Sequence, residues 1–348
     1  MIDVKWKRFP LVAQNSSARA WLTIQANLGL APNTIEAYGR ALQDYLVFSA
    51  GQQIAPASAR REHIAAYVRE LSSRQNSLGT RTGRLSSSVG LANATIQQRL
   101  TAVRLFYDYM MEEGFRTDNP VGRGRYTPGK NFGRAIDRGL IQRYRRLPWI
   151  PSDEEWLAVV EVARQESLRN RLMLALSYDA ALRREELCLL QSGDFDPAHC
   201  LLHVRAETTK NRRSRVVPYS RSTAELYVAY LRERRSLSRE RGLLFLSESR
   251  RNHAKPISFW TWSKVVHGIA ERSHIRRFTS HTPRHLCLTD LARAGWDIHE
   301  IATFAGHRST QTTLLYIHLS GRELAAKLQR SMESVHAWRI RMTMDILG

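Results

Sequence analysis

Residues 122–149 hold so many residues that break regular structure that no helix or strand can run through them. Glycine populates backbone conformations outside helices and strands, and proline lacks the N–H that both use. The interrupting residues are Gly122, Gly124, Pro128, Gly129, Gly133 and Gly139. The chain of 348 residues leaves room for a domain of ordinary size on either side. We therefore expect an N-terminal domain over 1–121, a linker over 122–149, a second domain over 150–319 and a C-terminal tail over 320–348.

The N-terminal part has helical periodicity and no strand pattern, which predicts a small all-α domain. Asn33 and Glu36 are the expected capping pair of its second helix. Residues 1–15 show no period and are expected to be irregular, and the Ser-, Gly- and Arg-rich stretch 73–92 predicts a long flexible basic loop. The expected helices run from Ser17 to about Leu28, from Pro32 or Asn33 onward, from about Arg61 to Ser72 and from about Ala94 to Glu113.

The second part is expected to be mostly helical, because its apolar period changes only briefly to that of strands. Residues 201–207 and 215–220 alternate as strands do, and the polar basic segment between them predicts a hairpin turn. Ser152 and Glu155 form a predicted capping box at the start of the domain. The helices predicted ahead of His281 are 153–166, 169–179, 184–190, 222–235 and 258–271. The fold expected is mainly α with a small β hairpin.

The stretch from His281 to His318 predicts three short helices with sharp ends. Thr282 is the expected cap of the first, with Pro283 in its first turn, and Gly295 ends it. Asp297 and Glu300 form a predicted capping box for the second, which Gly306 ends. Ser309 or Thr310 would cap the third. Polar residues therefore coincide with helix ends throughout this stretch.

Charge indicates the class of partner. Lys and Arg number 53 against 32 acidic residues, a formal net charge of +21. An excess of this size favours a polyanionic partner, with nucleic acid first, over a protein that is merely soluble and basic. The linker shares the sign, so we expect it to contact a phosphate backbone and not to be only a solvated tether. The linker cations that we assign to DNA are Arg123, Arg125, Lys130, Arg134, Arg143, Arg145 and Arg146, and the hairpin turn adds Arg212 and Arg213.

The cellular compartment is inferred from features that the sequence lacks. No apolar run approaches the ~18 residues of a membrane span, and the N-terminus does not have the pattern of a signal peptide. Three cysteines, Cys188, Cys200 and Cys287, are an odd and sparse set. We expect a reduced compartment, no membrane partner and, for a prokaryotic chain, a cytoplasmic protein associated with the nucleoid.

A set of cationic and phenolic side chains suggests the chemistry. A phosphoryl group in transfer needs its negative charge balanced, and paired guanidinium forks can do this without a metal ion. A tyrosine can be the nucleophile when a neighbour accepts its proton. His281 and His285, with Cys287 nearby, could be zinc ligands, but no second ligand pair has metal spacing, so no metal or cofactor is expected. The candidates are Arg183, Lys210, His281, Arg284, His285, His307 and Tyr316.

The order of these motifs resembles the tyrosine recombinases of the phage integrase family over nearly the whole chain. The matching segments are LRREEL at 182–187, Lys210 ahead of Val217-Pro218, HTPRH at 281–285, Gly306-His307, Tyr316 nine residues later, and in the N-terminal half 33–45 and 94–110. Ala180-Ala181 and Pro283 depart from the usual residues, and the 73–92 loop and the linker are longer than the minimal form. None of these departures removes a catalytic residue of the family.

The resemblance implies a fold and an activity. The N-terminal domain would be a SAM-like core-binding domain on DNA, followed by an α+β catalytic domain. Tyr316 would attack a phosphate of duplex DNA and form a 3′-phosphotyrosyl bond, without metal or ATP. The implied roles are charge stabilisation by Arg183 and Arg284, general acid catalysis by Lys210, acceptance or relay of the tyrosine proton by His281, a phosphate contact by His307, and support by Glu186 and His285.

The family also implies an assembly. Recombination joins two DNA sites and needs four active sites, so a homotetramer is expected, with the segment after Ser320 docked on a neighbouring protomer and accessory proteins as further partners. Whether the chain integrates, resolves or transposes is left open. Two alternatives also remain open: a type IB topoisomerase, which shares the phosphotyrosyl chemistry, and a non-catalytic DNA-binding regulator on the same scaffold.

Overall fold

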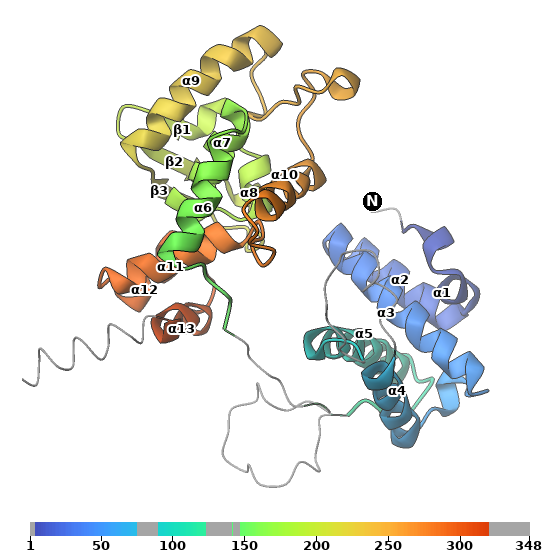
Figure 1. Cartoon of the computed structure of the whole chain (residues 1–348). Coiled ribbons are helices and arrows are strands. Elements are labelled where there is room, and N and C mark those ends of the chain that lie inside the picture. Colours follow the sequence, from blue (N-terminus) through green and yellow to red (C-terminus); the bar gives the residue numbers. More distant parts are fainter. Residues whose placement is uncertain (1–3, 75–89, 123–140, 142–146, 320–348) are drawn as a thin grey trace, which may run out of the picture. The chain divides into compact units, whose positions relative to one another are not determined.

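A computed structural model describes residues 4–74, 90–122, 141 and 147–319 (Figure 1). The chain divides into two compact units, Met1–Arg146 and Leu147–Gly348, and each has its own hydrophobic core. Within those ranges, no helix combines the length and apolar character that crossing a membrane requires.

In its described residues the N-terminal unit is all helical, as the periodicity predicts. Its core gathers aromatic side chains from several helices, and Tyr45 and Tyr107 share a buried hydrogen bond of 2.6 Å between their hydroxyls. The half-buried Asp44 carboxylate accepts hydrogen bonds from the Tyr67 hydroxyl and from Arg74. The main elements are α1 (Pro10–Gln14), α2 (Ser16–Asn27), α3 (Pro32–Gly51), α4 (Arg61–Ser73) and α5 (Asn93–Glu112), with 3-10 turns at Trp6–Arg8 and Pro56–Ser58.

Two local expectations for this unit are wrong. The described residues 4–15 are not irregular, because a 3-10 turn and α1 occupy most of them, and Phe9 and Val12 are buried in the core. Asn33 and Glu36 do not cap α3: the helix begins at Pro32, whose fixed φ suits a first helical position, and no side chain caps it. Arg8 and Arg40 engage the Glu36 carboxylate instead.

The second unit packs helices around a small antiparallel sheet. The sheet has three strands in the order β1 (Phe195–Asp196), β2 (Leu201–Val204) and β3 (Arg215–Pro218). The predicted hairpin is β2–β3, with Leu202 paired with Val217, and β1 is an addition, since two residues are too few to show alternation. The helices are α6 (Asp153–Ala163), α7 (Leu168–Asp179), α8 (Arg184–Cys188), α9 (Arg221–Leu237), α10 (Phe259–Arg272), α11 (Thr282–Arg293), α12 (Ile298–Ala305) and α13 (Thr310–Leu319).

Helix ends in the second unit follow the capping residues of the sequence. The boxes Ser152–Glu155 and Asp297–Glu300 are both present, which confirms those predictions. The cap of α11 differs: Thr282 is the first helical residue, and its hydroxyl accepts a hydrogen bond of 2.9 Å from the Thr279 N–H. In Figure 1, α11, α12 and α13 lie side by side at one end of the unit.

Candidate active site

The N-terminus of α8 holds Arg183 and Glu186 in a fixed relation. Glu186 Oε2 accepts a hydrogen bond of 2.9 Å from the Arg183 N–H, and Oε1 accepts one of 2.8 Å from Arg183 Nη1. A carboxylate in the first turn satisfies an otherwise unpaired N–H and is favoured by the helix dipole. The Arg183 side chain remains 24% exposed, so its guanidinium is oriented by Glu186 and is still accessible to a ligand.

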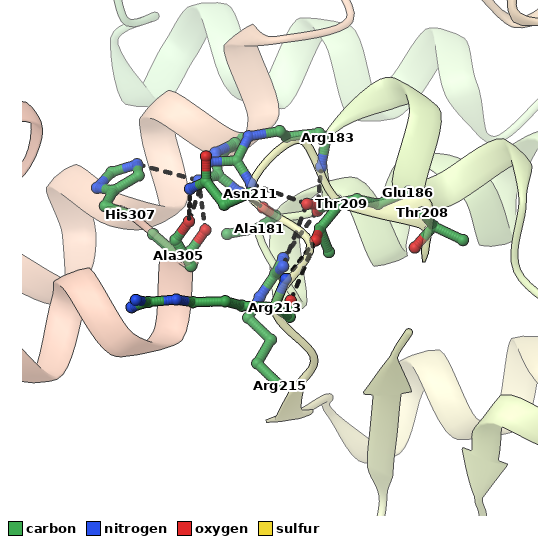
Figure 2. A network of polar contacts seen from close by, with 12 residues as sticks. Ala181, Arg183, Glu186, Thr208, Thr209, Asn211, Arg213, Arg215, Ala305 and His307 are labelled. Atoms are coloured by element: carbon green, nitrogen blue, oxygen red, sulfur yellow. Dashed lines mark hydrogen bonds and ion pairs between the residues drawn. The ribbon is translucent and has the colours of Figure 1, made fainter. Parts of the chain in front are cut away.

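Glu186 is also the partner of Arg215 at the start of β3 (Figure 2). Arg215 Nη1 and Nη2 donate to the two oxygens of Glu186 at 3.1 and 2.8 Å, a bidentate pair between two buried side chains. Burial alone would raise the pKa of Glu186. The hydrogen bonds and charges of Arg215 and Arg183 outweigh burial and hold that pKa at about 2. The carboxylate therefore stays ionised across the useful pH range.

Replacing Glu186 by alanine should lower the free energy of unfolding of the second unit by about 3–5 kcal/mol, because Arg215 would be left as a buried charge without its partner. Urea unfolding of the full chain measures the loss. Glu185→Ala is the matched control, since that neighbouring carboxylate is 46% exposed. Equal losses in the two variants would contradict a special role for the buried pair.

The C-terminal end of α12 collects side chains from three other elements. The last carbonyls of a helix have no partner within the helix and carry partial negative charge, so they attract cations. Figure 2 shows three of them, Arg183, Asn211 and Arg215, near Ala305 at that end. The donors and acceptors are Arg215 Nε to Phe304 O (3.0 Å), Arg284 Nη2 to Ala305 O (2.7 Å), and Arg183 Nη2 and Asn211 Nδ2 to Gly306 O (3.3 Å each). The main chain of α12 thus organises the cationic cluster.

Gly306 is required at this helix end for two reasons. Its φ of +61° is in the left-handed region, which side chains disfavour. A Cβ at this position would also lie 3.0–3.4 Å from the Arg215 side chain. The glycine therefore lets the chain turn sharply into His307 while Arg215 lies directly against it.

Arg284 is almost fully buried, at 4% exposure, in the first turn of α11. It donates to the carbonyl of Ala181 as well as to that of Ala305. Burial lowers the pKa of Arg284, the Arg183 charge lowers it further, and the resulting value of about 10 leaves the guanidinium charged at neutral pH. Arg284 therefore joins the segment before α8 to the end of α12 and adds a second positive charge beside Arg183.

The hydrogen bonds of His307 define its tautomer. Arg284 Nη2 lies 3.0 Å from His307 Nε2, and a guanidinium can only donate, so Nε2 is the acceptor. The proton of the neutral ring is then on Nδ1, which donates to the Thr313 hydroxyl at 3.0 Å. Burial and then the charge of Arg284 lower the pKa of His307 to about 3. His307 is therefore a neutral ring held between α11 and α13.

Tyr316 lies on α13 with its ring buried at 3% exposure. Its hydroxyl is 3.0 Å from His285 Nδ1, and its ring stacks on His307 with centroids 6.0 Å apart. Burial lowers the pKa of His285 to about 4, so the ring is neutral, and in the tautomer with its proton on Nε2 it accepts the phenol O–H. Burial also raises the pKa of Tyr316, and the charges of Arg284 and Arg183 oppose that rise. The phenol is thus next to both histidines and within the field of both arginines.

The half-buried His285 and His307 predict how stability depends on pH. The pKa values of His285 and His307 in the folded chain are about 4 and about 3, below the ordinary 6.5. As pH falls below 6.5, the two histidines become protonated in the unfolded chain before they do in the folded chain. The stability that the two neutral rings contribute is therefore complete above pH 6.5 and is lost toward pH 3.

His307→Gln can still accept from Arg284 and donate to Thr313, and its free energy of unfolding should fall less steeply with pH in this window. The measurement is urea unfolding as a function of pH, with replacement of the exposed His203 by glutamine as the control; equal slopes in wild type and His307→Gln would contradict the assignment.

The structure brings six of the predicted residues together: Arg183, Glu186, Arg284, His285, His307 and Tyr316, with His285 directly on the tyrosine. We assigned His281 to accept or relay the tyrosine proton and gave His285 a supporting role. The ring within hydrogen-bond distance of the phenol is that of His285. His281 is exposed, and its ring centroid is 6.4 Å from that of His285, one helical turn away.

Other predicted residues are outside this cluster. Lys210 is exposed in the turn between β2 and β3 and makes no hydrogen bond or ion pair with the residues that the structure describes. Arg212 and Arg213 are exposed in the same turn. The linker residues Arg123, Arg125, Lys130, Arg134, Arg143, Arg145 and Arg146 lie outside the described residues, as does the tail from 320 onward.

Sequence reasoning missed three residues of the site: Arg215, Asn211 and Thr313. Asn211 follows Lys210 and links its turn to Gly306, and Thr313 fixes the His307 tautomer. A buried carboxylate such as Glu186 requires cationic partners, and this requirement was the one signal that could have indicated Arg215. The two residues lie 29 positions apart, so no local pattern connects them. As for metals, His, Cys, Asp and Glu form no group of three or more able to hold an ion within the described ranges.

Comparison with known families gives two matches. Residues 152–323 match the phage integrase family, and residues 21–114 match the phage integrase N-terminal SAM-like domain. Together the two matches span most of the chain.

Curated relatives align over nearly their whole length. Tyrosine recombinase XerC of Herpetosiphon aurantiacus is 26% identical over 308 residues, which cover 86% of this chain and 89% of the relative. Transposase A from transposon Tn554 of Staphylococcus aureus is 26% identical over 324 residues and covers 88% of each chain. Tyrosine recombinase XerD of Caulobacter vibrioides is 28% identical over 309 residues, covering 86% of this chain and 90% of the relative.

Solved structures share the fold at low sequence identity. The XerH site-specific recombinase bound to palindromic difH substrate matches with a TM-score of 0.62 and 20% identity, over 88% of this chain and 80% of that one. The Tn1549 transposon integrase in complex with a circular intermediate DNA matches with a TM-score of 0.63 and 14% identity, over 86% and 94%.

Proposed function

The chain belongs to the phage integrase family and is a site-specific tyrosine recombinase that cuts and rejoins DNA, and on that premise we propose how its residues divide the reaction. Tyr316 attacks a scissile phosphate of duplex DNA, a 3′-phosphotyrosyl bond forms, and the bond to the 5′ oxygen breaks. A 5′-hydroxyl from another strand later reverses the step. The single observation that supports this best is the Tyr316 hydroxyl at 3.0 Å from His285, on a ring stacked against His307, which Arg284 contacts.

The cationic cluster supplies charge stabilisation in this proposal. Arg183 and Arg284 offset the negative charge that develops on the non-bridging phosphate oxygens. Arg183 is oriented by Glu186 yet partly exposed, which suits it for direct contact with phosphate. Arg284 and His307 are hydrogen-bonded to each other, so a phosphate oxygen that contacts one of them also lies close to the other. Glu186 is a positioning residue, since both of its oxygens are used by Arg183 and Arg215.

Two protons move in the proposed step. His285 accepts the phenol proton, because it is neutral at pH 7 and already within hydrogen-bond distance. His281, one turn earlier and exposed, passes the proton to solvent. Lys210 protonates the leaving 5′ oxygen, and its exposed position in the β2–β3 turn suits a side chain that must reach the DNA. No metal ion or nucleotide enters these steps.

The experiment that tests this function traps the covalent intermediate. The protein is incubated with a nicked DNA carrying its target site, which loses a short strand on cleavage and cannot religate. The expected result is an adduct on Tyr316 by peptide mapping, formed at the same rate with and without EDTA. A regulator without catalysis would give no adduct. A topoisomerase would give the adduct and relax a plasmid, but would yield no recombinant junctions from two target sites.

Duplex DNA is the partner in the proposed assembly, and the solved relatives named above were captured on DNA. We assign the core-binding role to residues 1–121, the basic linker to 122–149, and catalysis to 150–319. The linker arginines and Lys130, with Arg212 and Arg213, would contact the phosphate backbone in a sequence-independent manner. Four protomers would act on two paired sites, with accessory proteins as further partners.

The tail from 320 to 348 is proposed to dock on a neighbouring protomer. Deleting residues 322–348 should then leave DNA binding and single-site cleavage within about threefold of wild type while pairing of two sites is lost. Mobility-shift gels with one-site and two-site DNA measure both. The control replaces the same residues with a glycine-serine segment of equal length. Retained pairing after deletion would contradict docking in trans.

A further inference from the structure

A pocket of about 750 Å³ lies at the C-terminal end of α9, and we refer to it as the α9 pocket. From this helix end the chain continues to Leu243, which forms an antiparallel β-bridge with Gln191. None of its lining residues belongs to the cationic cluster around Tyr316. Its volume is in the range of pockets that hold small organic ligands. The residues that matter here are Tyr227, Leu231, Arg235, Arg239, Glu240 and Arg241.

Arg234 preforms the α9 pocket. It is 7% exposed, and within the described part of the chain it is the only lining arginine whose guanidinium makes hydrogen bonds. Its guanidinium donates to four main-chain carbonyls of the segment that follows α9: Ser238, Glu240, Leu243 and Leu244, at 3.0–3.3 Å. These hydrogen bonds hold the segment 238–244 against the C-terminal end of α9 and offset the partial negative charge of its carbonyl oxygens. The wall of the pocket is therefore fixed before any ligand arrives.

Three further guanidiniums line this fixed wall. Arg235, Arg239 and Arg241 are exposed, and over residues 4–74, 90–122, 141 and 147–319 they make no hydrogen bond or ion pair. Glu240 is the one carboxylate among the lining residues. Like charges that share a small concave surface repel each other, and an anion bound between them relieves that repulsion. Tyr227 and Leu231 add an apolar side to the same hollow.

We propose that the α9 pocket binds phosphate groups through Arg235, Arg239 and Arg241, at a site separate from the catalytic cluster. Guanidinium forks match phosphate oxygens in geometry and give charge-assisted hydrogen bonds. Three forks around a space larger than one phosphate suit a ligand with at least two phosphate groups. Adjacent phosphates of a DNA backbone and a free organic polyphosphate share this chemistry, and the experiment separates the two sources.

The test uses the full chain and two double variants of equal net charge. Arg235→Ala/Arg239→Ala removes two pocket guanidiniums, while Arg221→Ala/Arg232→Ala removes two exposed arginines of α9 that do not line the pocket. Pyrophosphate binding is measured by calorimetry without DNA, and DNA affinity is measured over a series of salt concentrations. Both variants are expected to melt as wild type does and to keep DNA cleavage, because none of the four residues has a partner among the described residues.

Pyrophosphate should bind wild type and the control variant alike, and the pocket variant should bind it at least about tenfold more weakly. If DNA occupies the pocket, the slope of log affinity against log salt also falls by about 2 in the pocket variant alone, close to one for each phosphate contact. An unchanged slope with lost pyrophosphate binding identifies a free organic phosphate as the occupant. Equal pyrophosphate binding by the two variants, or none by wild type, would overturn the proposal.

Discussion

Tyr316→Phe is expected to form no covalent DNA adduct while binding DNA with nearly normal affinity. The change removes one oxygen, the proposed nucleophile, and keeps the ring that stacks on His307. Only the hydrogen bond to His285 is lost from the fold, at a cost of about 1 kcal/mol. Adduct formation on a nicked target DNA and a mobility-shift titration with intact DNA measure the two properties.

Tyr178→Phe is a matched control for that variant. Tyr178 is a half-buried tyrosine of the same unit, and its hydroxyl donates to Asp290 at 2.8 Å. Loss of this oxygen should have a comparable effect on stability and none on adduct formation. An adduct that persists in Tyr316→Phe would show that another residue is the nucleophile, and peptide mapping would identify it.

Arg183→Ala is expected to slow DNA cleavage by about 10²–10³-fold or more, the usual effect of removing one donor to a developing oxyanion. The loss should appear in the single-turnover rate with saturating enzyme, because the interaction matters most in the transition state. Arg183 is a cleaner target than Arg284, whose removal would also leave the carbonyls of Ala181 and Ala305 without their buried donor. Arg284→Lys is the gentler substitution at that position.

Arg184→Ala controls for charge beside the same helix end. Arg184 adjoins Arg183 in sequence but donates to the Ser263 hydroxyl at 3.2 Å, away from the α12 carbonyls. It should change the cleavage rate by less than about tenfold. If the two variants slowed cleavage equally, the effect would belong to local charge and not to a placed donor.

The elements of this fold that were predicted correctly are specified by local sequence, and those that were missed depend on long-range packing. Asp297 and Glu300 define the start of α12 because a capping box needs only four consecutive residues. Strand β1 escaped prediction because its two residues pair with β2, and a pair so short has no periodicity. The α1 helix escaped because it is only five residues long and is packed through Val12, so burial rather than a local pattern identifies it.

The candidate site shows the same division. Residue types and their order were enough to select Arg183, Arg284, His307 and Tyr316. Their order could not say which histidine meets the phenol, since His281 and His285 are one helical turn apart and only the packing of α13 on α11 distinguishes them. Nor could it reveal Arg215, whose importance depends on a carboxylate from a distant helix.

The oxygens that hold three arginines at the end of α12 belong to the main chain, and this affects how the enzyme can change. Substituting Phe304 or Ala305 alters packing but cannot delete a carbonyl, so random mutagenesis of this segment should yield many active variants. Gly306 would be the exception, because its conformation and not its chemistry is what the neighbouring Arg215 requires. A laboratory campaign that retargets the enzyme could therefore diversify the exposed positions of the helix, such as Thr303, and leave the Gly306 codon fixed.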